Sequence, residues 1–319
     1  MILGVLGLSR LGLVSAIAFS KKKVKTIAID KNLPKIIKNN KIISISEPKL
    51  DENIKDNKFL TFSNNFEDIS KCDLLYIAED IPTDRRGNSD NRSILKIINI
   101  ALKFIKKDST LIIHSQVRPG FTRSIFEKKH KKIFYQVETL IFGQAFYRAY
   151  NPERIIIGKD ALEKKIDTKF RNFLKKFNCP IIEMTFESAE LTKISINMYL
   201  ISSITFANYM SGLAKKINAD WNSIVEALKL DKRIGSHAYI YPNVGISGGN
   251  LERDLKSTEK LSLSKGYSQS LPIFYRKLSN NQKDWVYNIL KKNKINGKIG
   301  ILGLSYKENT NSIKNSPSC

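Results

Sequence analysis

The sequence has few cysteines and few histidines. Among 319 residues there are only three of each, and they are widely separated. No two cysteines form a CxxC pair and none has a histidine beside it, so neither a zinc site nor a disulfide framework is predicted. An odd number of scattered cysteines fits a reducing compartment, and we expect a cytoplasmic protein. These residues are Cys72, Cys179 and Cys319, with His114, His130 and His237.

Long apolar runs are also scarce. Only the first 23 residues resemble an export signal, but no basic residue precedes their apolar run and Arg10 lies inside it. A strand-like segment follows at 24–30, so we expect this region to be part of the fold. No uncharged run of 18 residues exists elsewhere, which excludes a transmembrane helix and a membrane partner. No repeat of 20–50 residues is present either.

Acidic residues are outnumbered. Lys and Arg total 54 against 30 Asp and Glu, which gives a formal charge of +24 and a pI near 9.8. Such a charge is compatible with nucleic-acid binding. However, the lysines are spread along the chain among many Ile and Asn residues, and aromatic residues are not interleaved with them as in RNA-binding proteins. We therefore interpret the charge as background enrichment and expect no nucleic-acid partner.

The first thirty residues follow the pattern of a dinucleotide-binding βαβ unit. A strand at 2–6 is followed by a glycine turn, a helix at 11–19, a second strand at 24–29 and Asp30. Strand and helix patterns continue to alternate, which predicts a parallel, doubly wound α/β sheet of the Rossmann type. The further strands are expected at 74–78, 110–114 and 133–137, with a helix at 91–106.

The glycine turn has the sequence Gly7-Leu8-Ser9-Arg10-Leu11-Gly12, with Ser9 at the middle glycine of GxGxxG. Glycines there let a pyrophosphate approach the backbone at a helix N-terminus. Asp30 suits the ribose hydroxyls and favours NAD over NADP. The alternative is a Rossmann unit that has lost its cofactor.

The second half of the chain has a helical pattern. A segment of about thirty residues starts at Phe186 and has no Gly or Pro before Gly212. Its Glu residues come early and its Lys residues late, as a helix dipole prefers. We expect one long helix here, and shorter helices further on. The other expected elements are helices at 221–229, from about Asp254 and at 282–293, a glycine loop at 242–250, and a strand at 298–304 that must pair with something.

Eight segments, in chain order, together resemble motifs of the UDP-glucose/GDP-mannose dehydrogenase family. Any one of them is weak evidence, but all eight occur in the family's order and together they span essentially the whole chain. The pairs are Gly7–Gly12 (GLSRLG, family GLGYVG), Ser46–Leu50 (SEPKL, EPGL), Ile77–Asp90 (IAEDIPTDRRGNSD, VGTP…G…D), Ser115–Gly120 (SQVRPG, STVPPG), Asn151–Ile155 (NPERI, NPDRI), Ala189–Lys193 (AELTK, AELVK), Asp231–Gly235 (DKRIG, DxRIG) and Gly303–Ser318 (GLSYK…SPS, GLAFK…SPS).

The resemblance implies an enzyme that oxidises the CH2OH group of a UDP- or GDP-linked sugar to a carboxylate with two NAD. It also implies three regions. They are an NAD-binding Rossmann-like domain at 1–183, an all-helical central domain at 184–280 whose helix 187–217 pairs two subunits into a homodimer, and at 281–319 a linker helix and the incomplete start of a C-terminal nucleotide-sugar-binding domain.

The decisive departure lies in the family's GFGGSCFPKD loop, which corresponds to Gly245–Asp254. In the family a cysteine traps the aldehyde as a thiohemiacetal, which allows the second oxidation. Asn250 stands at that position here, and an amide is not a nucleophile under these conditions. We therefore expect the usual four-electron reaction to fail, or to run by an uncatalysed second step.

The other catalytic positions implied by the resemblance are mostly kept. Lys193 and Asn197 lie four residues apart, on one face of a helix, where the family holds the sugar C6 oxygen and a water. Asp254 matches the water-activating acid. Glu138 matches the first glutamate of PEFLREG, whose second glutamate is replaced by Phe142.

The remaining implied contacts serve the cofactor and the substrate. Gln116 replaces the threonine of STV, Ile81 that of GTP, and Arg253 replaces a lysine. No metal site is expected. The predicted cofactor contacts are Gly7, Ser9, Leu11, Gly12, Asp30, Lys35, Gln116 and Arg253, and the predicted substrate contacts are Arg233, Tyr241, Gly245, Gly248 and Gly249.

Three hypotheses follow. The first is an NAD-dependent nucleotide-sugar dehydrogenase that performs one alcohol-to-carbonyl step, in which Lys193 stabilises an alkoxide. The second is a catalytically inactive relative that binds a nucleotide sugar or another subunit. The third is a basic, nucleic-acid-binding Rossmann protein.

Overall fold

The structure is a computed structural model that describes residues 1–39, 41–82, 89–128, 130, 132–295, 297–306, 312, 313 and 315–319. These residues form two compact units, each with its own core. Unit 1 comprises Met1–Pro82 and Ser89–Lys193, and unit 2 comprises Ile194–Tyr306 and Ser312–Cys319.

Unit 1 is built on an eight-stranded sheet with the order β10-β9-β8-β7-β6-β1-β2-β5. Neighbouring strands are parallel except β8 and β9, which are antiparallel. A separate two-stranded ribbon pairs β3 with β4. The strands are β1 Ile2–Leu6, β2 Lys25–Ile29, β3 Ile37–Lys38, β4 Lys41–Ile42, β5 Leu60–Ser63, β6 Leu74–Ile77, β7 Thr110–Ile113, β8 Ile133–Gln136, β9 Ile155–Lys159 and β10 Ile181–Thr185.

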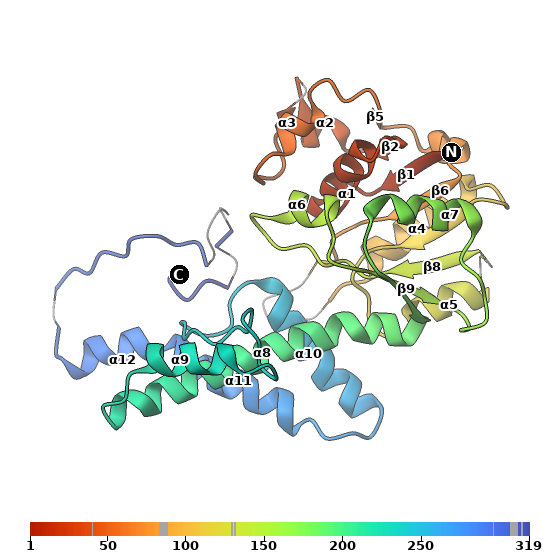
Figure 1. Cartoon of the computed structure of the whole chain (residues 1–319). Helices are drawn as coiled ribbons and strands as arrows, with labels where there is room; N and C mark the ends of the chain where they lie inside the picture. The colour runs from red at the N-terminus through yellow and green to blue at the C-terminus, as the bar shows by residue number, and fades with distance from the viewer. Residues whose placement is uncertain are drawn as a thin grey trace. The chain divides into compact units, whose positions relative to one another are not determined.

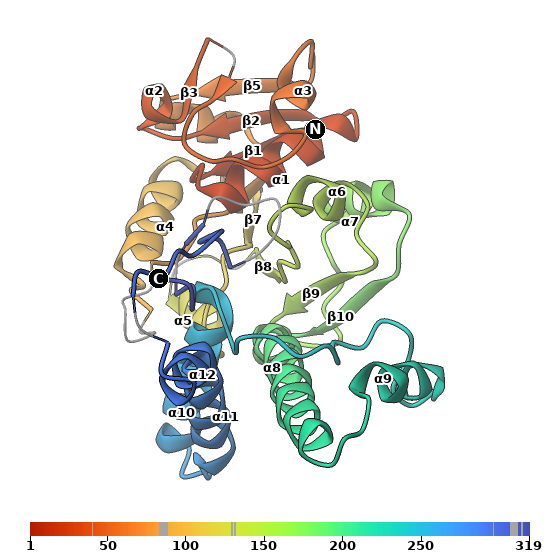
Figure 2. The same ribbon diagram turned by 90° about the vertical axis from the view of Figure 1, so that its left-hand side faces the viewer.

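The connections of unit 1 carry its helices, and α1 lies beside α6 (Figure 1; Figure 2). Its α-helices are α1 Arg10–Lys21, α2 Leu33–Ile36, α3 Leu50–Ile54, α4 Arg92–Phe104, α5 Phe121–Lys128, α6 Ala145–Tyr150 and α7 Thr168–Leu174, and its 3-10 helices are η1 Phe66–Lys71 and η2 Lys175–Phe177.

The central strands of the unit 1 sheet, β1 and β6 to β9, are buried on both faces, whereas the edge strands β5 and β10 are partly exposed. Along β6, Leu74 and Tyr76 pack into one apolar cluster, while Leu75 and Ile77 pack into another. Successive side chains of a strand point to opposite faces of a sheet, so the central strands contribute side chains to two apolar cores, one on each face. The doubly wound, mostly parallel α/β arrangement expected from the sequence is confirmed.

Unit 2 is helical in its described part, and α10 lies beside α11 (Figure 2). Its first helix, α8, starts in unit 1. In its small core the Trp221 indole N–H donates to the carbonyl oxygen of Ile240 at 3.1 Å. Within the described residues, no helix is both long and apolar enough to cross a membrane. The helices are α8 Phe186–Lys216, α9 Trp221–Leu230, α10 Gly249–Ser264, α11 Ser270–Lys283 and α12 Trp285–Lys292.

Several expected elements need correction. The segment 298–304 is not a strand, because no described strand pairs with it, and its apolar side chains are exposed. Helix α10 begins at Gly249 rather than near Asp254, and the helix expected at 282–293 is divided between the end of α11 and α12. Strands β5, β9 and β10 were not anticipated. The segment resembling VGTP…G…D is only partly described, because residues 83–88 lie outside the described ranges.

Candidate active site

The β1–α1 turn needs both of its outer glycines. Gly7 has φ +89°, a conformation that L side chains rarely adopt. A Cβ on Gly12 would lie 1.8 Å from the carbonyl oxygen of Gly7 and 3.0 Å from that of Ala78. Neither position accepts a side chain without moving the backbone, so the turn keeps the frame of a dinucleotide-binding unit.

Position 9 does not require glycine, since the φ of Ser9 is −62°, which any residue can adopt. Its hydroxyl donates to the carbonyl oxygen of Ala78 at 3.2 Å and accepts from the N–H of Asp80 at 2.8 Å. The serine at the middle glycine position therefore ties the turn to the segment that follows β6.

Asp30 follows β2, and its carboxylate contacts the same turn. One oxygen accepts from the N–H of Leu8 at 2.9 Å and the other from the N–H of Asn32 at 2.8 Å. Helix α1 has neither an acidic residue in its first turn nor a side-chain cap from a described residue. Its first N–H groups thus face the space that an anion occupies at a helix N-terminus. These residues fit a dinucleotide cofactor.

The remaining predicted cofactor residues of unit 1 are less informative. Leu11 is buried in α1, Lys35 is exposed on α2, and Gln116 is half-buried in the loop after β7. Their cofactor roles stay predictions.

Glu138 and Lys193 form a buried ion pair in unit 1. The Lys193 ammonium on α8 lies 2.9 Å from one Glu138 oxygen, and the N–H of Leu140 donates to the other at 2.8 Å. Less than a tenth of either residue is exposed. Burial alone would raise the pKa of Glu138, but the charge and hydrogen bond of Lys193 outweigh it and hold that pKa below its usual value. The unit thus contains a fixed, charged ammonium.

Arg10 and Phe142 show a paired departure from the family motifs. Arg10 stands at the tyrosine of GLGYVG and Phe142 at the second glutamate of PEFLREG, and the guanidinium lies 4.5 Å from the Phe142 ring centroid. Arg10 also pairs at 2.7 Å with the buried carboxylate of Glu47, which accepts from the N–H groups of Gly143 and Ala145. Of these two motif positions, the one that is aromatic in the family is charged here, and the one that is charged in the family is aromatic here. The sequence interpretation noted only the loss of the glutamate.

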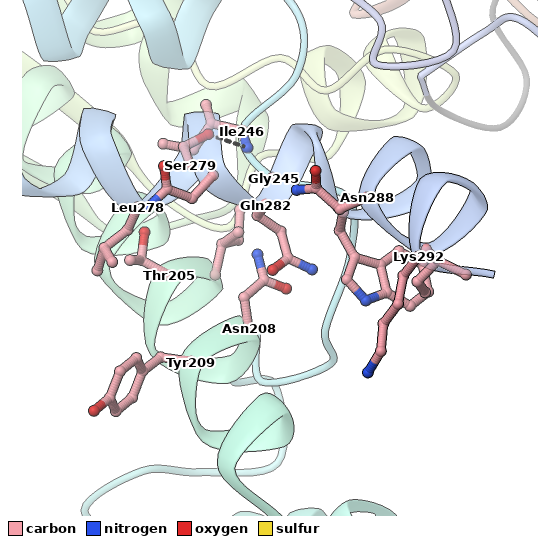
Figure 3. A pocket seen from close by; sticks show the side chains of 14 residues that line it. Thr205, Asn208, Tyr209, Gly245, Ile246, Leu278, Ser279, Gln282, Asn288 and Lys292 are labelled. Carbon is pink, nitrogen blue, oxygen red and sulfur yellow. Dashed lines mark hydrogen bonds between the residues drawn. The ribbon is translucent and has the colours of Figure 1, made fainter. Parts of the chain in front are cut away.

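In unit 2 the glycine loop before α10 is held against α11. Gly245 has φ +94°, and a Cβ there would lie 2.8 Å from the carbonyl oxygen of Ser279. The next N–H, of Ile246, donates to the Ser279 hydroxyl at 2.8 Å (Figure 3). Gly248 has φ +78° and directly precedes Gly249, the first residue of α10.

Asn250 is exposed in the first turn of α10, whereas Asp254, one turn further on, is buried. The Asn197 amide donates to one Asp254 oxygen at 2.5 Å, and the Arg253 guanidinium lies 3.2 Å from the other. The structure therefore brings Asn197, Asp254 and Arg253 together in unit 2. Arg253, predicted as a cofactor contact, is buried and paired with this carboxylate.

The predicted substrate residues Arg233 and Tyr241 are exposed and engaged locally. Arg233 pairs with Asp231 at 2.6 Å, and this hydrogen-bonded guanidinium holds the pKa of Asp231 below its usual value. The Lys229 ammonium lies 4.4 Å from the Tyr241 ring centroid. The last described segment also reaches the glycine loop, because the Asn315 amide donates to Glu252 and lies 3.5 Å from the Gly248 carbonyl oxygen.

A cavity of about 300 Å³ lies between α8, the glycine loop, α11 and α12 (Figure 3). Of the predicted site residues only Gly245 lines it, and none of its lining residues is a carboxylate. Its walls are amides, such as Asn208 and Gln282, hydroxyl groups, apolar side chains and the ammonium of Lys292. None of the predicted catalytic residues is among its lining residues. Among the described residues, no cluster of three His, Cys, Asp or Glu side chains is arranged to hold a metal.

Comparisons with known proteins agree with this geometry. The profile of the UDP-glucose/GDP-mannose dehydrogenase family, NAD binding domain, matches residues 1–178, and that of the family's central domain matches residues 187–281. The chain is 27% identical to UDP-glucose 6-dehydrogenase YwqF of Bacillus subtilis, over 98% of this chain and 74% of that protein. It is 30% identical to UDP-glucose 6-dehydrogenase of Campylobacter jejuni, over 98% and 80%.

A solved structure gives the same result. A UDP-glucose dehydrogenase from the archaeon Pyrobaculum islandicum superposes with a TM-score of 0.90 at 26% identity, covering 99% of this chain and 77% of the other. The motif order, the β1–α1 turn, the Glu138–Lys193 pair and these matches lead to one conclusion. The chain belongs to the UDP-glucose/GDP-mannose dehydrogenase family of NAD-dependent nucleotide-sugar dehydrogenases.

Proposed function

We propose that this protein oxidises the CH2OH group of a UDP- or GDP-linked sugar to the aldehyde in one two-electron step. The alcohol loses a hydride, for which NAD, when bound, is the acceptor, and a proton, which passes to solvent water. The observation that carries the proposal is a contrast. The buried Glu138–Lys193 pair is intact, while the position of the family's thiol holds an exposed amide, Asn250.

Lys193 is suited to the first oxidation. Its ammonium is charged, nearly water-excluded and fixed by Glu138, so it can stabilise the alkoxide that forms as the hydroxyl loses its proton. Glu138 acts through Lys193, as the positioning residue. Asn197 and Asp254 keep the hydrogen-bonded pair of unit 2, and we assign them to the sugar oxygen and a bound water.

Covalent capture has no counterpart at the glycine loop. Asn250 offers no thiolate, so no thiohemiacetal forms and the aldehyde cannot be oxidised further through a thioester. Of the free cysteines, Cys72 is buried in unit 1, where burial raises its thiol pKa to about 12 and leaves it protonated. The product is therefore released at the carbonyl level.

We also propose that α8 pairs two copies of the chain. Four exposed apolar side chains recur along it at spacings of seven, three and four residues, so they share one helix face, and a fifth follows directly after the helix ends at Lys216. They are Tyr199, Phe206, Tyr209, Leu213 and Ile217. Sedimentation velocity tests this proposal: Tyr209→Glu should convert a dimer to a monomer, whereas Leu230→Glu, at an exposed apolar position on α9, should leave the dimer intact. A monomeric wild-type protein would contradict it.

A specific set of replacements favours a second candidate, an inactive nucleotide-sugar binder. Gln116 and Ile81 stand at the family's threonines, and Asn250 at its cysteine. The scattered reduced cysteines fit the cytoplasm for either candidate.

Turnover with a panel of UDP- and GDP-linked sugars separates the candidates. We expect NADH together with a product lighter than the substrate by two hydrogens, identified by mass spectrometry. A carboxylate product would contradict the single step. No NADH with any sugar, combined with thermal stabilisation by a nucleotide sugar, would favour the inactive binder.

A further inference from the structure

A carboxylate lies directly against the β1–α1 turn. Glu79 follows β6, and its Oε2 lies 2.7 Å from the place a Cβ would occupy on Gly7. The N–H of Glu79 donates to the Ser115 hydroxyl at 2.9 Å, which fixes this backbone to the end of β7. Glu79 and Asp80 stand at the valine and glycine of the VGTP motif, so this chain has two acids at two uncharged positions.

The surroundings of Glu79 add negative charge. Burial, together with the charges of Asp80 and Asp30, raises the pKa of Glu79 to about 7. The cation of the turn itself, Arg10, is bonded to Glu47. Within the described residues, neither a hydrogen-bond donor nor a cation is engaged with the Glu79 carboxylate.

The same turn is where a dinucleotide places its pyrophosphate. A pyrophosphate carries two negative charges throughout the neutral pH range, so an ionised Glu79 against Gly7 opposes it. A protonated Glu79 removes this repulsion and offers an O–H donor to an anionic oxygen. The protonated form is therefore the one compatible with the cofactor.

We propose that Glu79 takes up a proton when NAD binds, so that this site binds NAD less tightly as the pH rises. The inference rests on the proposed function, because it concerns the same cofactor site. Below about pH 7 Glu79 already holds the proton, and binding is nearly independent of pH. Above it, binding must draw a proton from solvent, and the dissociation constant rises by up to about tenfold per pH unit.

Calorimetric titration of the full chain with NAD measures this linkage directly. Heats in two buffers of different ionisation enthalpy give the number of protons taken up. We expect about half a proton at pH 7, where Glu79 is about half ionised, and an affinity about tenfold weaker at pH 8 than at pH 6.

Glu79→Gln removes the titrating group and keeps its shape. We expect this variant to take up no proton and to bind NAD about tenfold more tightly than wild type at pH 8. The matched control is Asp80→Asn, a change at the exposed neighbour, which should keep the proton uptake. Glu79→Val, which restores the motif residue, should behave like Glu79→Gln and serves if the amide variant fails to fold.

The outcomes separate this inference from the proposed function. Binding without proton uptake, or uptake that persists in Glu79→Gln, overturns the inference and leaves the proposed function standing. Binding by Glu79→Gln alone supports the inference. No binding by wild type or by either Glu79 variant at pH 6 overturns the cofactor assignment, and the inference with it.

Discussion

Two glycine-bearing turns lead into helices in this molecule, the β1–α1 turn of unit 1 and the loop Gly245–Gly249 of unit 2. Both keep glycine where a Cβ would meet a backbone carbonyl, at Gly12 and at Gly245. Both differ from the family motif at a position where the backbone accepts other side chains. Ser9, at the middle glycine, has an ordinary φ, and Asn250, at the cysteine, is exposed. The frame of each site is thus set by packing, while its chemistry changes where packing permits.

A third helix start shows what an internal carboxylate does at such a place. At the N-terminus of α5, the buried Glu190 accepts from the N–H of Gly120 at 2.6 Å and from that of Thr122 at 2.8 Å. Its two oxygens accept from donors that a helix start leaves unpaired. The α1 start has no such cap among the described residues, which keeps its donors available to a ligand.

The largest effect is expected at the buried pair. Lys193→Met leaves Glu138 buried without its cation, which should destabilise the protein by about 3–5 kcal/mol in urea unfolding. It should also lower the rate of sugar oxidation by about a hundredfold or more.

The double variant Lys193→Met, Glu138→Gln separates these two effects. It leaves no unpaired charge, so stability should largely return while the rate stays low. Recovery of the rate in the double variant would show that Lys193 acts on stability alone.

The two helical glycines Gly12 and Gly212 offer a matched comparison. Gly12→Ala forces a Cβ against the Gly7 carbonyl and should cost about 3 kcal/mol, measured by urea unfolding. Gly212 lies in α8 with open space around its Cβ position, so Gly212→Ala should stabilise by up to about 1 kcal/mol. Equal effects would mean that the frame of the β1–α1 turn is not set by close packing.

Glu190 predicts a pH dependence of stability. Burial raises its pKa to about 7, so between about pH 5 and pH 7 the folded protein keeps a proton that the unfolded chain releases. This contribution to stability is present at low pH and is lost as the pH rises through that window. The free energy of unfolding of wild type, minus that of Glu190→Gln, should fall by about 1 kcal/mol per pH unit. A constant difference would contradict the raised pKa, since other titrating groups cancel in it.

The smallest effect on stability is expected at the exposed end of α10. Asn250→Cys should change the free energy of unfolding by less than about 0.5 kcal/mol. Because the new thiol lies in the first turn of α10, the helix dipole favours its thiolate, and mass spectrometry should then detect a carboxylate product. An unstable variant would mean that Asn250 has a packing role.

Much of unit 1 followed from the sequence. Alternating buried strands predicted the mostly parallel sheet correctly, because parallel strands buried on both faces leave strong apolar runs. The antiparallel pair β8–β9 was not predictable, since nothing local in its strands distinguishes the two directions. The strand expected at 298–304 was wrong because apolar pattern alone does not supply a pairing partner.

The site was predicted less completely. Lys193 and Asn197 were predicted as site residues because their helical spacing and motif positions agree, and Glu138 because of its motif position, and these assignments stay predictions. Glu79 was missed, although its motif position is normally valine, because only the folded chain places it against Gly7. The Arg10–Phe142 pair was missed for a related reason: the two substitutions lie far apart in sequence and explain each other only in contact.

The proposed single oxidation is decided by the ratio of NADH formed to nucleotide sugar consumed. With the wild-type chain we expect one NADH per sugar, with the product at the carbonyl level. Two NADH per sugar, with a carboxylate product, would mean that this site completes both oxidations without a thiol at position 250, and the single step would be wrong.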